Sequence, residues 1–156
     1  MPASYSFTSR WSVPLAAPRV WDEVERMLRP GADGTWWPGV RIVEPAASLA
    51  PGEHLQLAVR SPLGYRLRVR LTIDAVDPGR SLAASSDGDL QGTGRLTVEP
   101  AAEGASVLVF DWDVATARRW MNATAWVLRP AFERAHAHVM TAGERGLRAR
   151  LEQAGG

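Results

Sequence analysis

The amino-acid sequence predicts an α+β domain in which a curved antiparallel sheet wraps a long C-terminal helix. Apolar and polar residues alternate with the period of two typical of half-buried strands in several segments between residues 5 and 115. One long helical pattern then fills residues 118–151. A chain of 156 residues, 46% of them hydrophobic, can build one substantial core, so we expect a single domain over residues 1–156.

The N-terminal part predicts a strand followed by short helices. Alternating apolar and polar side chains predict the first strand over residues 5–13. Apolar residues at spacings of three and four over 17–28, with a proline in the first turn, predict a short amphipathic helix. A second short helical turn, or a bulky aromatic loop, is expected at Trp36-Trp37-Pro38-Gly39, and a strand over 40–43 follows it. We therefore expect two short helices after the first strand.

The central part predicts an antiparallel meander. Further strands are expected over 55–59, 65–73, 81–85, 94–99 and 106–115, which gives about seven in all. In the segment 65–73 the apolar residues alternate with Arg66, Arg68, Arg70 and a threonine, so one face of the sheet covers a core and the other meets water. We interpret these arginines and Arg60 as a solvated outer face of the sheet, in preference to a basic binding patch.

The C-terminal pattern is the strongest helical signal in the chain. Its apolar stripe consists of Met121, Ala125, Leu128, Phe132, Ala135, Val139, Ala142 and Gly146. Pro130 lies inside the pattern and removes the hydrogen bond to the carbonyl of Trp126, so we expect a bend there or a break just before it.

Charge and composition exclude several classes of protein. The net charge of +1, from 18 basic and 17 acidic residues, gives no field that would favour nucleic acid or an anionic membrane as a partner. No apolar run approaches the length of about 18 residues that a membrane span needs, so we expect no membrane insertion. The start of the chain does not read as a secretory signal, and we expect a cytoplasmic protein. Because there are no cysteines, disulfides, thiolate nucleophiles and cysteine-containing zinc sites are excluded.

The order of these elements resembles a known superfamily. The resemblance rests on four segments of the sequence. These are Trp11 to Val13 followed by Pro18-x-x-Trp21-Asp22, the segment Trp36 to Val40, the segment Phe110 to Val114, and His136-x-x-Val139-Met140-x-x-Gly143-Glu144-x-Gly146-Leu147. On these residues the chain resembles the START and birch-pollen-allergen (SRPBCC) superfamily, and within it the polyketide cyclase/dehydrase and lipid-transport group. The resemblance spans about residues 5–151 and implies the helix-grip fold. It also implies a cavity between the sheet and the helix, in a family that includes lipid carriers, hormone receptors, aromatases and cyclases.

Strand parity and helical angles predict the wall of such a cavity. The sheet would contribute Leu57, Val59, Tyr65, Leu67, Val69, Leu96, Phe110 and Trp112, and the helix would contribute Met121, Leu128, Phe132 and His136. The alternative is that these residues pack a dry core. Trp36 and Trp37 form a lid over the mouth of the cavity, or one of them anchors the short helices to the sheet.

The polar candidates are few. His136 and His138 point roughly 200° apart on a helix, and His54 is the only other histidine, so we expect no metal site. His136 lies nearer the apolar stripe and is the better candidate for a polar group in the cavity. Asp111 and Asp113 have the parity of the solvent face; a register slip of one residue would instead make them an acid/base pair inside the cavity.

These observations favour a protein that binds a small hydrophobic or aromatic molecule, as a carrier or by sequestration, without a cofactor. The alternative is a polyketide aromatase/cyclase or dehydratase in which Tyr65 and His136 are the catalytic residues that polarise a ketone and move protons. A regulatory module that binds a partner protein would need a large apolar exterior patch. Whether the protein is an enzyme, and whether it forms a homodimer, stays open at this point.

Overall fold

A computed structural model describes residues 4–28 and 36–155, with side chains as far as residue 153. Its elements in chain order are β1 (Ser4–Val13), α1 (Ala17–Leu28), β2 (Val40–Glu44), β3 (His54–Arg60), β4 (Arg66–Asp77), β5 (Ser81–Gly88), β6 (Leu90–Pro100), β7 (Ser106–Thr116) and α2 (Arg119–Gly155). The seven strands and the long terminal helix confirm the predicted α+β helix-grip architecture.

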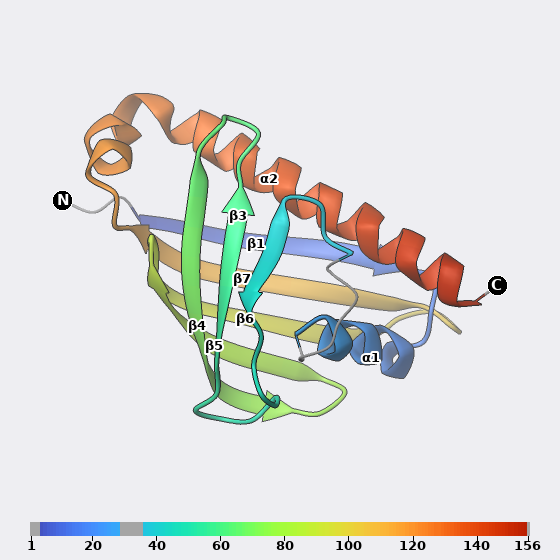
Figure 1. Cartoon of the computed structure of the whole chain (residues 1–156). Helices are drawn as coiled ribbons and strands as arrows, with labels where there is room; N and C mark the ends of the chain where they lie inside the picture. The colour runs from blue at the N-terminus through green and yellow to red at the C-terminus, as the bar shows by residue number, and fades with distance from the viewer. Residues whose placement is uncertain (1–3, 29–35, 156) are drawn as a thin grey trace.

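The seven strands form one antiparallel sheet in the order β1-β7-β6-β5-β4-β3-β2. The first strand of the chain therefore pairs with the last, with Tyr5 opposite Val114 and Trp11 opposite Leu108. Figure 1 shows β2, β3 and β4 crossing the direction of β1 and β7 at a steep angle, so the sheet is strongly curved. Its concave face receives α2.

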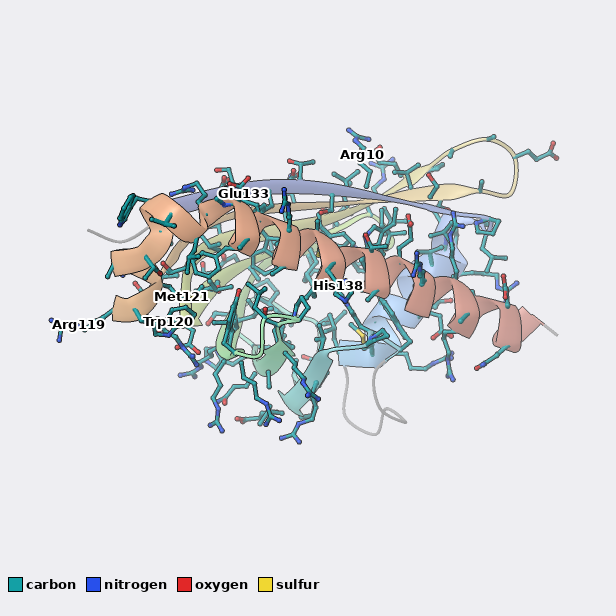
Figure 2. The ribbon with its side chains drawn as sticks, turned by 90° about the horizontal axis from the view of Figure 1, so that it is seen from above. Arg10, Arg119, Trp120, Met121, Glu133 and His138 are labelled. Atoms are coloured by element: carbon teal, nitrogen blue, oxygen red, sulfur yellow. The ribbon has the colours of Figure 1, made fainter. Side chains whose placement is uncertain are left out.

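Helix α2 lies lengthwise over the sheet, beside β1, and covers its concave face (Figures 1 and 2). It continues through Pro130 without a break, and Figure 1 shows it bending in its orange N-terminal part. The expected bend is therefore observed. A proline inside a helix lacks the N–H for one backbone bond and crowds the preceding turn, which accounts for the change in direction.

Two side chains of α2 bond the backbone of the edge strand β1 at Ser12. Glu144 Oε2 accepts a hydrogen bond from the backbone N–H of Ser12 at 3.0 Å, and Arg148 Nε donates to the carbonyl oxygen of Ser12 at 2.9 Å. These side chains occupy backbone groups that an edge strand would otherwise leave to another chain.

Two glycines of α2 allow the segment Trp36 to Pro38 to approach the helix. A Cβ atom at Gly143 would lie 2.5 Å from Cε2 of Trp37 and 2.6 Å from Cη2 of Trp11. A Cβ atom at Gly146 would collide with the backbone carbonyl oxygen of Trp36. These glycines thus serve close packing, although glycine disfavours a helix interior.

Helix α1 closes one end of the sheet. Its buried face includes Val20, Trp21, Val24, Met27 and Leu28, which confirms the predicted amphipathic pattern. Glu23 is also buried, and its carboxylate pairs with Arg26 at 2.7 Å and with Arg150 of α2 at 3.3 Å. The paired carboxylate thereby connects α1 to the last turns of α2.

Two details differ from the sequence-based expectations. Leu128 does not belong to the buried stripe of α2, because the residue is 37% exposed. The prediction assumed one uniform helical phase, whereas the bend at Pro130 separates Met121 and Ala125 from the buried residues that follow. Between β1 and β2 the described residues contain one helix, and Trp36 to Gly39, where a short helical turn or an aromatic loop was expected, form a turn and no helix.

Candidate functional site: an apolar cavity between the sheet and helix α2

A cavity of about 230 Å³ lies between the concave face of the sheet and α2. All seven strands contribute to its wall, together with α1, α2 and Trp36 and Trp37. The curved sheet and a single helix leave this space because side chains from only two layers cannot fill it. The predicted alternative of a dry, filled core is therefore wrong for the centre of the fold.

Most of the predicted wall residues line this cavity. They are Trp36, Trp37, Leu57, Val59, Tyr65, Leu67, Val69, Leu96, Phe110, Trp112, Met121, Phe132 and His136. The exception is Leu128, which is exposed and does not contribute to the wall. The period of two along β3, β4, β6 and β7 was thus sufficient to identify the concave face.

The sequence reasoning missed several other wall residues. They are Tyr5 and Phe7 of β1, Val24, Met27 and Leu28 of α1, Val40 and Ile42 of β2, and further residues of β4 to β7 and α2 such as Ala84, Leu90 and Met140. The signal for Tyr5 and Phe7 was present, because they alternate with polar residues in the predicted first strand. That strand had been treated as the opening of the domain, and its pairing with β7 was not anticipated.

Hydrogen-bonding groups in the wall are few, and the hydroxyl groups of Ser61 and Thr116 are occupied. Ser61 Oγ accepts the backbone N–H of Leu63 at 3.1 Å, and the hydroxyl of Thr116 donates to Asn122 Oδ1. In contrast, the hydroxyl of Tyr5 and Nε1 of Trp36 are buried and have no hydrogen-bond partner among the described residues. Burial raises the pKa of the Tyr5 hydroxyl, so it stays protonated at neutral pH.

His136 lies on the cavity side of α2, as its helical angle predicted. Its ring stacks on Phe7 at a centroid distance of 3.8 Å and an interplanar angle of 11°. Burial lowers the pKa of His136 from 6.5 to about 4, so the imidazole is neutral at physiological pH. His138 is exposed, and His54 bonds Thr72 on the exposed side of the sheet at 3.0 Å.

Trp36 and Trp37 stack on each other with a centroid distance of 5.9 Å and an interplanar angle of 4°. Nε1 of Trp37 donates to the backbone carbonyl of Val139 at 2.8 Å, and its ring packs edge-on against Trp11 and Phe110. Trp37 thus anchors this segment to α2, an attachment that the sequence reasoning did not consider. Both rings also line the cavity.

Asp111 and Asp113 point away from the cavity. Asp111 Oδ1 accepts a hydrogen bond from Thr8 Oγ1 at 2.8 Å, and Asp113 Oδ1 accepts one from Ser6 Oγ at 2.6 Å, both on the exposed face. The solvent-face assignment is confirmed, and the register-slip alternative with an internal acid/base pair is wrong. Of the described residues that line the cavity, only Arg95 carries a formal charge, and it is exposed and lies opposite Asp111 in the sheet.

Within residues 4–28 and 36–155, no cluster of three or more histidine or carboxylate side chains is arranged to hold a metal ion. No helix in the same part of the chain combines the length and apolar character needed to span a bilayer.

Comparison with known proteins places these observations in context. Residues 4–152 match the family model described as polyketide cyclase / dehydrase and lipid transport. None of the curated proteins is a significant match.

Solved structures share the fold at low sequence identity. The protein TTHA0849 from Thermus thermophilus is 16% identical, with 97% of this chain and 100% of that chain covered and a TM-score of 0.75. The Zhui aromatase/cyclase from Streptomyces sp. R1128 is 17% identical, with 97% and 95% covered and a TM-score of 0.70. A START superfamily protein from Mycobacterium smegmatis is 16% identical, with 96% and 98% covered and a TM-score of 0.67.

Proposed function

Because the chain belongs to the polyketide cyclase / dehydrase and lipid transport family, we propose that it binds a small, uncharged, largely apolar molecule in its central cavity and carries or sequesters it. The observation that supports this most directly is the composition of the wall around the 230 Å³ space. Aliphatic and aromatic side chains from every strand and both helices face it. Apolar pockets with a few polar groups are the usual form of small-molecule sites.

The charge of the wall argues for an uncharged ligand. His136 is neutral at physiological pH, and the side chain of Arg95 is exposed. An anion or cation inside the cavity would lose its hydration without gaining a counter-charge, which is costly in an apolar environment. The ligand class is therefore neutral, with an aromatic or aliphatic body.

The alternative function is an aromatase/cyclase or dehydratase, and aromatase/cyclase is the activity for which the Zhui protein is named. Tyr65 and His136 both line the cavity and are the candidates for its catalytic residues. However, general acid/base catalysis works best with a pKa near the working pH, and the pKa of His136 is lowered to about 4. Because Asp111 and Asp113 point outward, no carboxylate of β7 assists it. We favour the carrier for these reasons.

A cavity-filling substitution tests the proposal. Ala84 of β5 is buried and faces the cavity, so the ring in Ala84→Phe would occupy part of the 230 Å³. Ala83→Phe is the matched control, because the neighbouring residue of a strand points to the opposite face and does not line the cavity. Equilibrium dialysis with 2-isopropylnaphthalene, a neutral two-ring hydrocarbon, measures binding to the wild-type protein and to each variant.

We expect the wild-type protein and Ala83→Phe to bind the hydrocarbon with one saturable site, and Ala84→Phe to bind it at least tenfold more weakly. Circular dichroism must show that both variants are folded. Equal affinity of a folded Ala84→Phe and the wild-type protein would place the binding site elsewhere and would contradict the proposal.

A further inference from the structure

The exposed hydrophobic side chains of the protein gather at one end of the molecule. Six large hydrophobic residues of the described chain are exposed, and five of them belong to the first turns of α2 or to the hairpin between β3 and β4. We call this surface the apolar end; its members are Leu63, Trp120, Trp126, Val127 and Leu128. Single apolar side chains scattered over a surface are ordinary, whereas a cluster of them marks a contact with another molecule or a membrane.

Two elements bring these residues together. The ring of Trp120 packs edge-on against Tyr65, which follows the hairpin tip, at a centroid distance of 5.4 Å and an interplanar angle of 70°. Leu63 belongs to that tip, and Figure 1 shows the tip beside the N-terminal part of α2. Val127 follows Trp120 by seven residues, close to two helical turns, so both lie on one side of α2. The apolar end is therefore a single surface built by the helix and the hairpin.

The segment of α2 at the apolar end is uncharged on all sides. Residues 120–128 contain no charged side chain. Met121 is buried and lines the cavity, whereas Trp126 on the outer side is 85% exposed. A helix that is apolar all round is normally buried. The sheet covers only the inner side of this segment, so its outer side is available to a partner.

Arginines without an ionic partner surround the apolar end. Arg60 and Arg66 flank the hairpin and lie directly opposite each other in the pairing of β3 with β4. Arg119 precedes Trp120, and Figure 2 shows it extending from the end of α2 away from the body of the protein. No carboxylate of the described residues forms a salt bridge with these three arginines. Like charges that face each other in a sheet are unfavourable, so an anionic partner would relieve the repulsion.

We propose that the apolar end is a docking surface for the headgroup region of a bilayer that contains anionic phospholipids, with Trp126 as its principal anchor. Tryptophan is enriched at membrane–water interfaces, and arginines beside it are attracted by anionic headgroups. Docking of this kind needs no spanning helix. The net charge of +1 had led us to expect no anionic membrane as a partner, but a net charge does not describe how arginines are distributed over a surface.

The inference goes beyond the proposed function and does not depend on it. None of the five residues of the apolar end lines the cavity. The same turns of α2 nevertheless separate the two, because Met121 faces the cavity and Trp126 faces outward. A docked protein would thus hold its cavity about one helix diameter, roughly 10 Å, from the bilayer surface.

Two other occupants fit the apolar end less well. In a symmetric contact, a second copy of the chain would bring its own Arg60, Arg66 and Arg119 toward the same three residues, and like charges repel. A partner protein would need a pocket of complementary shape to receive the projecting ring of Trp126. A fluid headgroup region receives projecting apolar side chains without such a pocket.

Co-sedimentation with phospholipid vesicles tests the docking surface. The vesicles consist of phosphatidylcholine alone or of phosphatidylcholine with one quarter phosphatidylglycerol, at low and at high NaCl concentration. Trp126→Ser removes the principal anchor, and Arg119→Glu reverses one of the surrounding charges. The matched controls are Val43→Ser, at the exposed hydrophobic residue of β2, and Arg145→Glu, at an exposed arginine in the second half of α2.

We expect the wild-type protein to bind the anionic vesicles, and to bind more weakly without phosphatidylglycerol or at high salt, because ions screen the attraction of the arginines. Trp126→Ser should weaken binding by about tenfold, since it removes a large apolar side chain from the contact. Arg119→Glu should weaken it by at least about fivefold, the contribution of one basic residue near an anionic surface. Val43→Ser and Arg145→Glu should bind like the wild-type protein, and so should Ala84→Phe, whose added ring fills only the cavity.

The inference is overturned if the wild-type protein stays in the supernatant with both kinds of vesicle, or if folded Trp126→Ser and Arg119→Glu bind as tightly as the two controls. Analytical ultracentrifugation without vesicles addresses the second copy: a dimer that Trp126→Ser dissociates would assign the apolar end to self-association and would overturn the inference as well. Loss of vesicle binding in Ala84→Phe would indicate uptake of lipid into the cavity and refute docking alone. If the cavity binds no hydrocarbon while the vesicles are bound as predicted, the proposed function fails and this inference stands.

Discussion

Replacing Gly143 by alanine tests how α2 is held against the sheet. In an ordinary helix this change would stabilise the protein by about 1 kcal/mol, because alanine is the better helix former. Here the added Cβ would lie 2.5 Å from Cε2 of Trp37 and 2.6 Å from Cη2 of Trp11. Both rings belong to one aromatic cluster, with centroids 5.0 Å apart, so neither can yield without disturbing the other.

The expected change follows from three contributions. Overpacking a well-filled site costs about 1–3 kcal/mol. Displacing Trp37 also weakens its hydrogen bond to the carbonyl of Val139, worth about 1 kcal/mol. After the gain of about 1 kcal/mol in helix propensity is subtracted, Gly143→Ala should lower the free energy of unfolding by about 1–3 kcal/mol. Gly146→Ala should cost at least as much, because the obstacle there is the backbone carbonyl oxygen of Trp36 and no side-chain rotation relieves it.

Urea denaturation followed by circular dichroism at 222 nm measures the change in the free energy of unfolding. Tryptophan fluorescence is less suitable, since the substitution itself would alter it. Ala137→Gly, at an exposed position of α2, is the control for helix propensity and should cost about 1 kcal/mol. If Gly143→Ala were as stable as the wild-type protein or more so, the close packing of Trp37 and Trp11 on α2 would be refuted.

Three further predictions concern the helix, His136 and the wall of the cavity. Truncation before Asn122 removes nearly all of α2 and should abolish the cooperative thermal transition, because the concave face of the sheet loses its cover; a cooperative transition would refute the placement of α2. Since the folded pKa of His136, about 4, lies below its unfolded value of 6.5, the unfolded state binds more protons between these values. The free energy of unfolding should therefore fall as the pH drops from about 6.5 toward 4, by at most about 1.4 kcal/mol per pH unit. In urea titrations at several pH values, the free energy of unfolding of His136→Gln should fall less steeply than that of the wild-type protein. Parallel profiles of the two proteins would show that His136 is not buried as described. Trp112→Arg should abolish binding of 2-isopropylnaphthalene, whereas Asp113→Arg on the outer face should not; unchanged binding to a folded Trp112→Arg would place that ring outside the site.

The sheet could be predicted from the sequence in considerable detail. Alternation along residues 65–73 identified Leu67 and Val69 as cavity residues, and the opposite parity placed Asp111 on the outer face, where it bonds Thr8. A strand has a fixed period of two, so parity persists over its whole length unless a bulge intervenes. The sequence was therefore sufficient to predict which side chains of these strands face the cavity and which face outward.

Long-range arrangement was harder to predict. Leu128 was placed in the wall because one helical phase was assumed through Pro130, and the bend at that residue makes the assumption invalid. Tyr5 was recognised as an inward residue of its strand, but its position in the cavity depends on the pairing of β1 with β7, which joins the two ends of the chain. No local pattern contains that pairing, and so Tyr5 was absent from the predicted site although it lines the cavity.

The central claim is that an apolar molecule occupies the space between the sheet and α2, and intermolecular nuclear Overhauser effects test it most directly. With the methyl groups of the protein labelled and 2-isopropylnaphthalene bound, we predict contacts from the ligand to Leu67 and Val69 of β4 and to Met140 of α2 at the same time, because these side chains line the cavity from the sheet and from the helix. Contacts confined to exposed side chains such as Val127 or Leu63, with none to β4 and α2 together, would contradict the account.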